Sequence, residues 1–96
     1  MTRVAAARVG DTITQVIRVT RHCGCDPHSV VAYPAKRELV VDMGATATPT
    51  PTEVGDALGL DAMSMTWGPR CEHPIVSGRL GDMTVIIYTS TGGQTS

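Results

Sequence analysis

The chain has no phenylalanine, and only three of its 96 residues are aromatic, one tryptophan and two tyrosines. Leucine is also scarce, whereas valine, isoleucine and threonine together supply nearly a third of the sequence. Ten glycines and six prolines are scattered among them. A core made from these residues consists of small, branched side chains, which favour short strands. The composition therefore predicts one small, β-rich, all-β domain with little core to spare.

Strong charge and long apolar runs are missing as well. Eight Lys and Arg residues stand against nine Asp and Glu, and the densest basic spot is Lys36-Arg37, beside Glu38. No basic stripe alternates with aromatic residues, so nucleic-acid binding is not expected. The apolar stretch near the N-terminus is broken by Arg8 and is too short for a signal peptide or a membrane span. We therefore expect synthesis in the cytoplasm without a signal peptide.

A disulfide framework is not expected either, because the three cysteines are an odd number in a chain without a secretion signal. A bridge between Cys23 and Cys25 would close a tight, strained ring. The cysteines and histidines are nevertheless clustered. Two of each lie in TRHCGCDPHSVV (20–31), and the remaining Cys and His lie in RCEHPIVS (70–77).

Apolar runs at short spacing predict two hairpins. HSVVAY (28–33) and RELVVDM (37–43) are separated by Pro34-Ala35-Lys36, and HPIVSG (73–78) and MTVIIYT (83–89) are separated by residues 79–82. The segment ITQVIRVT (13–20) also favours a strand. After Thr52 we expect one helical turn at most, because Gly55 and Gly59 each weaken a helix there by about 1 kcal/mol.

The two halves of the chain resemble each other. Val9-Gly10-Asp11 recurs forty-five residues later as Val54-Gly55-Asp56, and the same offset relates His28 to His73. Each half then consists of a VGD turn, a Cys/His loop and two apolar strands, which indicates one supersecondary unit used twice. We expect a single domain over 1–90, with repeat halves at approximately 3–45 and 53–90, a Pro/Thr-rich connection at 46–52 and a flexible tail at 91–96.

This repeat places two Cys–His pairs in corresponding loops, which predicts a metal site. Zinc takes tetrahedral sites of thiolate and imidazole ligands, often with two ligands from each of two loops. A closed site of this kind is structural, and it would add folding energy that so small a core lacks. The expected ligands are Cys25, His28, Cys71 and His73, while His22 and Cys23 remain as substitutes for Cys25.

Three other interpretations of the clusters stay open. The cysteines can be small buried apolar residues beside loop histidines. A catalytic Cys–His dyad is disfavoured because no Asn or Asp stands in an obvious orienting position and the chain is short for a substrate cleft. The Cys23-Gly24-Cys25 run suggests redox chemistry, but the βαβ pattern expected around a thioredoxin-type site is absent from the sequence.

The segment AAARVGD (5–11) resembles the PAAR motif, Pro-Ala-Ala-Arg, which is commonly followed by Gly-Asp. Ala6-Ala7-Arg8 and Gly10-Asp11 match, and Ala5 stands in place of the proline. The second half, with VGDAL, a Cys/His loop and HPIVSGRLGDMTVIIY, is similar to the later part of that family's pattern. Arg79-Leu80-Gly81-Asp82 replaces its usual Ser-Pro turn.

The resemblance implies a small, pointed β-pyramid that caps a trimeric β-helical spike, one copy per trimer, in contractile phage tails and type VI secretion systems. It also implies a single zinc, or iron, near the vertex. Carried over to this chain, His28, Cys71 and His73 match best as ligands, and Cys25 or His22 supplies the fourth.

On this basis we expect a structural protein and not an enzyme. It would sharpen a membrane-piercing spike without binding the membrane stably, and without a small-molecule substrate. It would be assembled into a virion tail or injection apparatus and ejected from the cell. The alternative is a free-standing, zinc-stabilised β module that binds another protein or nucleic acid. A small thiol enzyme is a third, less favoured hypothesis, and it requires Cys25 or Cys71 to react readily in the folded protein.

Overall fold

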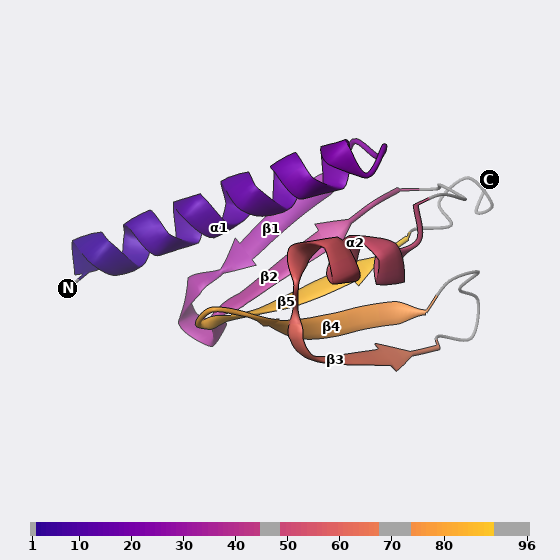
Figure 1. The fold of residues 1–96 in the computed structure, drawn as a ribbon. Helices are drawn as coiled ribbons and strands as arrows, with labels where there is room; N and C mark the ends of the chain where they lie inside the picture. The colour runs from indigo at the N-terminus through magenta and orange to yellow at the C-terminus, as the bar shows by residue number, and fades with distance from the viewer. Residues whose placement is uncertain (1, 45–48, 68–73, 90–96) are drawn as a thin grey trace, which may run out of the picture.

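A computed structural model describes residues 2–44, 49–67 and 74–89, and it arranges two α-helices and five strands in these ranges (Figure 1). A short 3-10 helix joins the first two strands. The elements in chain order are α1 (Thr2–His22), β1 (Ser29–Tyr33), η1 (Pro34–Lys36), β2 (Glu38–Asp42), α2 (Pro51–Leu58), β3 (Asp61–Thr66), β4 (Ile75–Leu80) and β5 (Met83–Tyr88).

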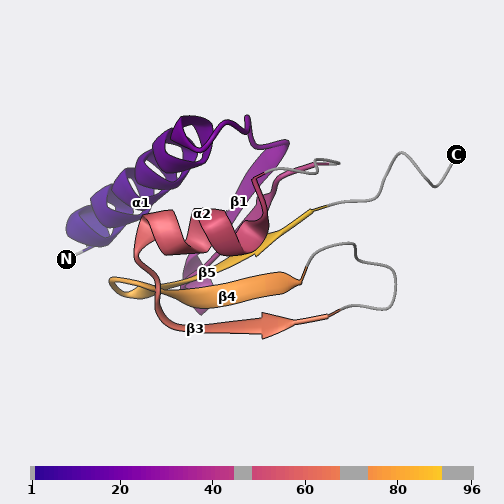
Figure 2. The same cartoon turned by 45° about the vertical axis from the view of Figure 1, so that its right-hand side comes forward.

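The five strands form one mixed sheet in the order β1-β2-β5-β4-β3. Neighbours are antiparallel except at the centre, where β2 and β5 run parallel. Both helices lie on the same side of this sheet, so the domain has two layers (Figure 2). The strand-rich composition is confirmed, but the expectation of an all-β chain is wrong because the helices form the second layer.

The longest element, α1, contains the segment 13–20 for which we expected a strand. Its apolar positions repeat every three or four residues: Val16 and Thr20 are fully buried, and Ile13 packs against the core. This spacing places the residues on one face of a helix. The hydroxyl of Thr20 donates to the main-chain oxygen of Val16 at 2.7 Å, which satisfies a buried polar group within the helix. Helical periodicity and packing therefore outweigh the β propensity of these branched residues.

Ala5–Asp11, the segment that resembles the PAAR motif, also lies in α1, so its VGD is not a turn. No helix in the described part of the chain is both long and apolar enough to cross a membrane.

The second helix is longer than expected because its start is well capped. Thr50 and Glu53 form a reciprocal capping box, and Pro51 occupies the first turn. Proline is tolerated there because a first-turn N–H has no helical partner. Gly59 ends α2 in the left-handed conformation that glycine adopts most easily. Pro51 and Gly59 thus mark the two ends of an eight-residue helix.

Both hairpins are confirmed. β1 and β2 pair antiparallel through η1, and Arg37 takes a left-handed conformation after it. β4 and β5 pair antiparallel across the two-residue loop Gly81-Asp82. Gly81 has φ 64°, which a type II′ turn requires at its first central position. The strand β3, which sequence analysis did not predict, adds to the outer side of β4.

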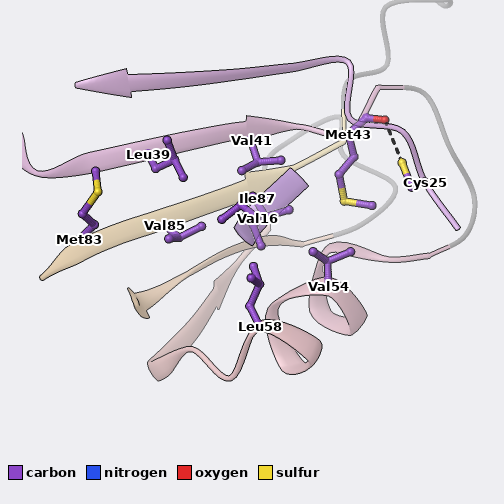
Figure 3. Close-up of a cluster of buried hydrophobic side chains, with 10 residues drawn as sticks. All are labelled: Val16, Cys25, Leu39, Val41, Met43, Val54, Leu58, Met83, Val85 and Ile87. Atoms are coloured by element: carbon purple, nitrogen blue, oxygen red, sulfur yellow. Dashed lines mark hydrogen bonds between the residues drawn. The ribbon is translucent and has the colours of Figure 1, made fainter. Parts of the chain in front are cut away.

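The core lies between the helices and the inner face of the sheet (Figure 3). It consists almost entirely of small aliphatic and sulfur-containing side chains, as the composition predicted. Its buried members are Val16, Cys25, Leu39, Val41, Met43, Val54, Leu58, Met83, Val85 and Ile87.

Candidate functional site

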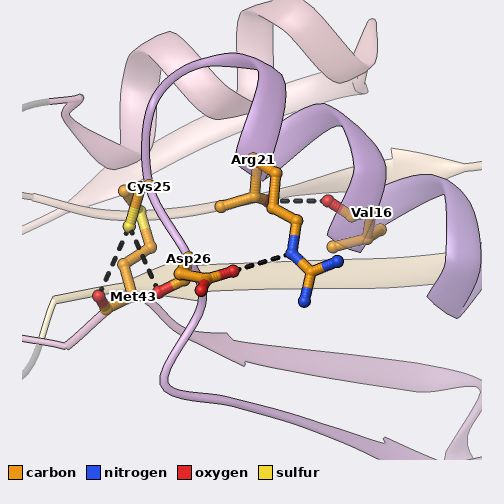
Figure 4. A network of polar contacts seen from close by, with 6 residues as sticks. Val16, Arg21, Cys25, Asp26 and Met43 are labelled. Atoms are coloured by element: carbon orange, nitrogen blue, oxygen red, sulfur yellow. Dashed lines mark hydrogen bonds and ion pairs between the residues drawn. The ribbon is translucent and has the colours of Figure 1, made fainter.

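The first candidate site is the Cys/His segment between α1 and β1. Its most buried member is Cys25, which is 7% exposed and belongs to the core cluster. The Cys25 thiol donates to the main-chain oxygens of Met43, at 3.5 Å, and of Asp26, at 3.7 Å (Figure 4). Burial raises the pKa of Cys25, and the nearby charges of Asp26 and Cys23 raise it further. This environment stabilises the neutral thiol.

The neighbouring residues of this segment are more accessible. His22 and His28 are exposed, and Cys23 is half-buried against the core. The guanidinium of Arg21 pairs with the carboxylate of Asp26 at 2.7 Å, which connects the end of α1 to the loop (Figure 4). The main-chain N–H of His28 donates to the oxygen of Asp42 at 2.7 Å, so His28 is held at the end of β2.

Cys71 and His73, the other two expected ligands, lie outside the described residues. The described strands show only at which end of the sheet β1 and β4 begin. β1 and β4 are both antiparallel to the central parallel pair, so both begin at the end where β2 and β5 finish. Their starts are separated by β2 and β5, which is three strand spacings, or about 14 Å. His28, just before β1, therefore lies at the end of the sheet where β4 also begins.

The described donors do not by themselves fit zinc. A zinc-bound cysteine is a thiolate, whereas Cys25 is a core side chain that donates to carbonyl oxygens. In residues 2–44, 49–67 and 74–89, no three His, Cys, Asp or Glu side chains come together. The zinc site with Cys25 as a ligand therefore stays a prediction.

The second candidate site is the outer face of the sheet, opposite the helices. Directly paired residues share a face of a sheet, and side chains alternate along each strand. Leu39, Val41, Val85 and Ile87 face the helices and are fully buried. The intervening residues face outward, and no described segment forms a layer over them.

Pairing joins the outward residues into rows across the sheet. Val31, Val40 and Ile86 are direct partners, so the middle row is apolar over three adjacent strands. It continues through Ser77 to Ser64, whose hydroxyls are 3.0 Å apart. Val31 remains 41% exposed. We call the outer surface of the sheet, made of this row and the row on either side of it, the open face. The outward residues of the open face on β1, β2 and β5 are Ser29, Val31, Tyr33, Glu38, Val40, Asp42, Thr84, Ile86 and Tyr88.

Two tyrosines stand at opposite ends of this face. Tyr33 is 46% exposed, and the ammonium of Lys36 lies 5.9 Å from its ring centroid. Tyr88 is half-buried and pairs with Asp42 in the parallel register. Burial raises the pKa of Tyr88, and the Asp42 carboxylate raises it further through its charge and a hydrogen bond. Tyrosine combines an apolar ring with a polar end, which suits a surface that contacts another protein.

The open face was not expected, because the sequences of β2 and β5 contain continuous apolar runs. The available signal was the alternation in ELVVD and MTVIIY, in which every second residue faces outward. Comparison of the chain with protein-family models, with curated proteins and with solved structures gives no match. The geometry of the described residues therefore carries the functional argument.

Proposed function

We propose that this chain is a non-catalytic protein-binding domain and that it binds its partner with the open face of its sheet. The observation that carries the proposal is the apolar row Val31–Val40–Ile86, which spans three adjacent strands opposite the helix layer. Val31 is 41% exposed, whereas Val40 and Ile86 are half-buried, and an apolar surface bordered by polar residues is typical of an interaction site. The helices and the core on the other face hold this surface rigid.

The charges of the open face favour a protein partner over nucleic acid. Glu38 and Asp42 lie on β2, and Arg79 on β4 is balanced by its cross-strand partner Asp61. A phosphate backbone requires a concentration of Lys and Arg, which these rows lack. The partner that fits is a protein with an apolar patch, whose polar rim can meet the carboxylates and the tyrosine hydroxyls.

A capture experiment tests this function with two matched lysine substitutions. Ile86→Lys places a charge in the centre of the open face, and Thr14→Lys places the same charge on the exposed side of α1. We expect the wild type and Thr14→Lys to capture one protein from native cells, and Ile86→Lys to lose it. Reconstitution with that purified protein should show at least about tenfold weaker binding for Ile86→Lys. Equal binding by the two variants, while both remain folded by circular dichroism, would contradict the proposal.

A second candidate is the structural tip of a trimeric, membrane-piercing spike. It is favoured by one observation, that β1 and β4 begin at the same end of the sheet. That end would form the apex of a pointed, β-pyramid-like tip, and the remaining surface would sit on the trimeric spike. A stable complex of one chain with three spike chains would support this function, whereas a one-to-one complex through the open face would exclude it.

A further inference from the structure

The turn that ends α1 places Cys23 and Cys25 on either side of Gly24. The N–H of Gly24 donates to the main-chain oxygen of Arg21 at 2.9 Å, and the N–H of Cys25 donates to that of Thr20 at 3.1 Å. These two bonds form a Schellman motif, in which a residue with positive φ follows the helix. Gly24 is that residue, with φ 105°. The motif thus holds both cysteines in a single turn.

Both cysteine side chains lie against the core. Cys25 is 7% exposed and belongs to the core cluster, and Cys23 packs against that cluster. The charge of Cys23 contributes to the raised pKa of Cys25, so the two thiol groups are close enough to interact. Residues two apart in a chain have Cα atoms at most about 7 Å apart, and disulfides span about 4.4–6.8 Å between Cα atoms. The spacing of these two free thiols therefore allows a bridge.

The fold nevertheless favours Cys25 in its reduced form. The thiol donates to the main-chain oxygens of Met43, at 3.5 Å, and of Asp26, at 3.7 Å (Figure 4). Met43 is 3% exposed, and its own N–H donates to Tyr88 at the end of β5. A disulfide sulfur carries no proton, so a bridge to Cys23 would remove both hydrogen bonds of the thiol. The folded structure therefore opposes the bridge that the turn allows.

From this geometry we propose that Cys23 and Cys25 form a reversible dithiol–disulfide site, which opens the connection between α1 and β1 when it is oxidised. A structural disulfide is not implied, because a bridge between residues two apart closes a strained ring. Strained disulfides have higher reduction potentials and are the labile ones that respond to the redox state of their surroundings. The site is independent of the open face, so it stands whether or not that surface binds a protein.

The oxidant that fits this site is a small disulfide such as glutathione disulfide. Cys23 is the more accessible cysteine of the turn. Its thiolate attacks one sulfur of the oxidant, which forms a mixed disulfide and releases one glutathione thiolate. The thiol of Cys25 then loses its proton to solvent, and its sulfur attacks the sulfur of Cys23 and displaces the second glutathione. The two cysteines lose two electrons and two protons in total, and glutathione disulfide becomes two glutathione thiols.

The opening that accompanies this reaction is confined to residues 23–27. On one side of this segment, α1 is held on the core by its buried residues. On the other side, the N–H of His28 donates to the main-chain oxygen of Asp42 at 2.7 Å. The ion pair of Arg21 with Asp26 crosses the segment, but both side chains are largely exposed, so it contributes little resistance. The helix and the sheet therefore stay in place while the turn between them opens.

The test is equilibration of the full chain in glutathione buffers, followed by acid quenching and alkylation in urea. The tryptic peptide 22–36 contains both Cys23 and Cys25, whereas Cys71 lies in peptide 71–79. As glutathione disulfide increases, we expect peptide 22–36 to become unalkylated and two hydrogen atoms lighter, and dithiothreitol should reverse this change. In the urea-unfolded chain the same bridge should need about tenfold less glutathione disulfide, because no thiol hydrogen bonds are lost there.

Two serine variants test the order of the steps. Cys25→Ser should accumulate the mixed disulfide of Cys23 with glutathione, whereas Cys23→Ser should stay mostly unmodified because Cys25 is buried. Hydrogen exchange measured by NMR reports the opening. Exchange at the N–H groups of Gly24 and Cys25 should be at least about tenfold faster in the oxidised chain, while exchange in the central strand β2 stays unchanged.

Three results would overturn the proposal. The first is a folded chain that forms no bridge within peptide 22–36, or that bridges Cys71 instead. The second is a bridge that forms equally in the folded and the urea-unfolded chain, since the fold would then not hold Cys25 reduced. The third is a bridge that leaves hydrogen exchange at Gly24 and Cys25 unchanged, since the connection would then not open.

Discussion

Leu60 lies directly over Gly78, at the contact between the end of α2 and strand β4. A Cβ atom added at Gly78 would lie 2.7 Å from the Cβ of Leu60 and 3.2 Å from the main-chain oxygen of Asp61. Neither of these atoms is the free end of a flexible side chain, so the neighbouring backbone would have to shift. We expect Gly78→Ala to lower the free energy of unfolding by about 1–3 kcal/mol, measured by urea denaturation followed by circular dichroism.

Gly10→Ala is the matched control for this substitution. Gly10 lies in α1, and nothing stands within 4 Å of an added Cβ. Alanine in a helix interior is more stable than glycine by about 0.5–1 kcal/mol, so Gly10→Ala should stabilise the protein. If Gly78→Ala were as stable as the wild type, the close approach of Leu60 to β4 would be wrong.

The raised pKa of Cys25 predicts how the free energy of unfolding depends on pH. Its raised pKa means that the unfolded chain loses the thiol proton at a lower pH than the folded chain does. The contribution of Cys25 to the free energy of unfolding should therefore be constant below the ordinary thiol pKa of about 8.5 and decline above it, by at most about 1.4 kcal/mol per pH unit. Between about pH 8.5 and 10 the slope should be smaller in Cys25→Ala, measured by urea denaturation at each pH. Equal slopes would mean that the Cys25 proton is not held by folding.

The rate of alkylation distinguishes a buried thiol in the core from a reactive, catalytic thiol. Cys25 is buried and neutral, whereas Cys23 is half-buried. With iodoacetamide at neutral pH, we expect Cys25 in the folded protein to react at least about tenfold more slowly than Cys23, as resolved by peptide mass spectrometry. Unfolding in urea should remove the difference. Faster reaction at Cys25 would support the thiol-enzyme hypothesis and contradict its placement in the core.

The position of Cys25 in the core changes the set of metal ligands that we expect. Because its thiol is part of the core, we expect zinc or iron to be bound through His28, Cys71 and His73, with His22 in place of Cys25. Native mass spectrometry should then show one metal per chain in the wild type and in Cys25→Ser. The His28→Ala/His73→Ala double variant should carry none. A folded wild type without metal would remove the metal site altogether.

The two hairpins could be predicted because their signals are local. Apolar runs of strand length flank Pro34 in the first hairpin and Gly81 in the second, and both residues suit the turns in which they lie. The sheet order could not be predicted from such signals. In the chain, β2 and β5 are separated by α2, β3 and β4. Their parallel pairing therefore depends on how these three elements pack, and no short stretch of sequence encodes that packing.

The helices were missed for identifiable reasons. The branched residues of 13–20 favour strands intrinsically, and only the buried stripe through Val16 and Thr20 reveals a helix. Alanine is the strongest helix former, so the run at 5–7 favours a helix even though it also forms the segment that resembles the PAAR motif. At α2, the sequence Thr50-Pro51-Thr52-Glu53 is a capping box, and it could have been recognised.

The expected repeat places both VGD segments in turns, whereas both lie in helices, and its offset differs from the strand pairing by one residue. The offset of forty-five maps Val41 onto Ile86, but the parallel register pairs Val41 with Ile87. Side chains alternate between faces, so an error of one residue exchanges the core face and the open face. The offset of forty-five therefore does not separate the outward residues from the core residues, whereas the alternation within ELVVD and MTVIIY does.

The most direct test of the proposed function is site-specific photo-crosslinking in cells that express the chain natively. A photoreactive amino acid at position 86 lies in the centre of the open face, and the same residue at position 14 lies on the exposed side of α1. We predict a covalent adduct between position 86 and one other protein, with little or none from position 14. No adduct at position 86, or the same adducts from both positions, would contradict binding through the open face.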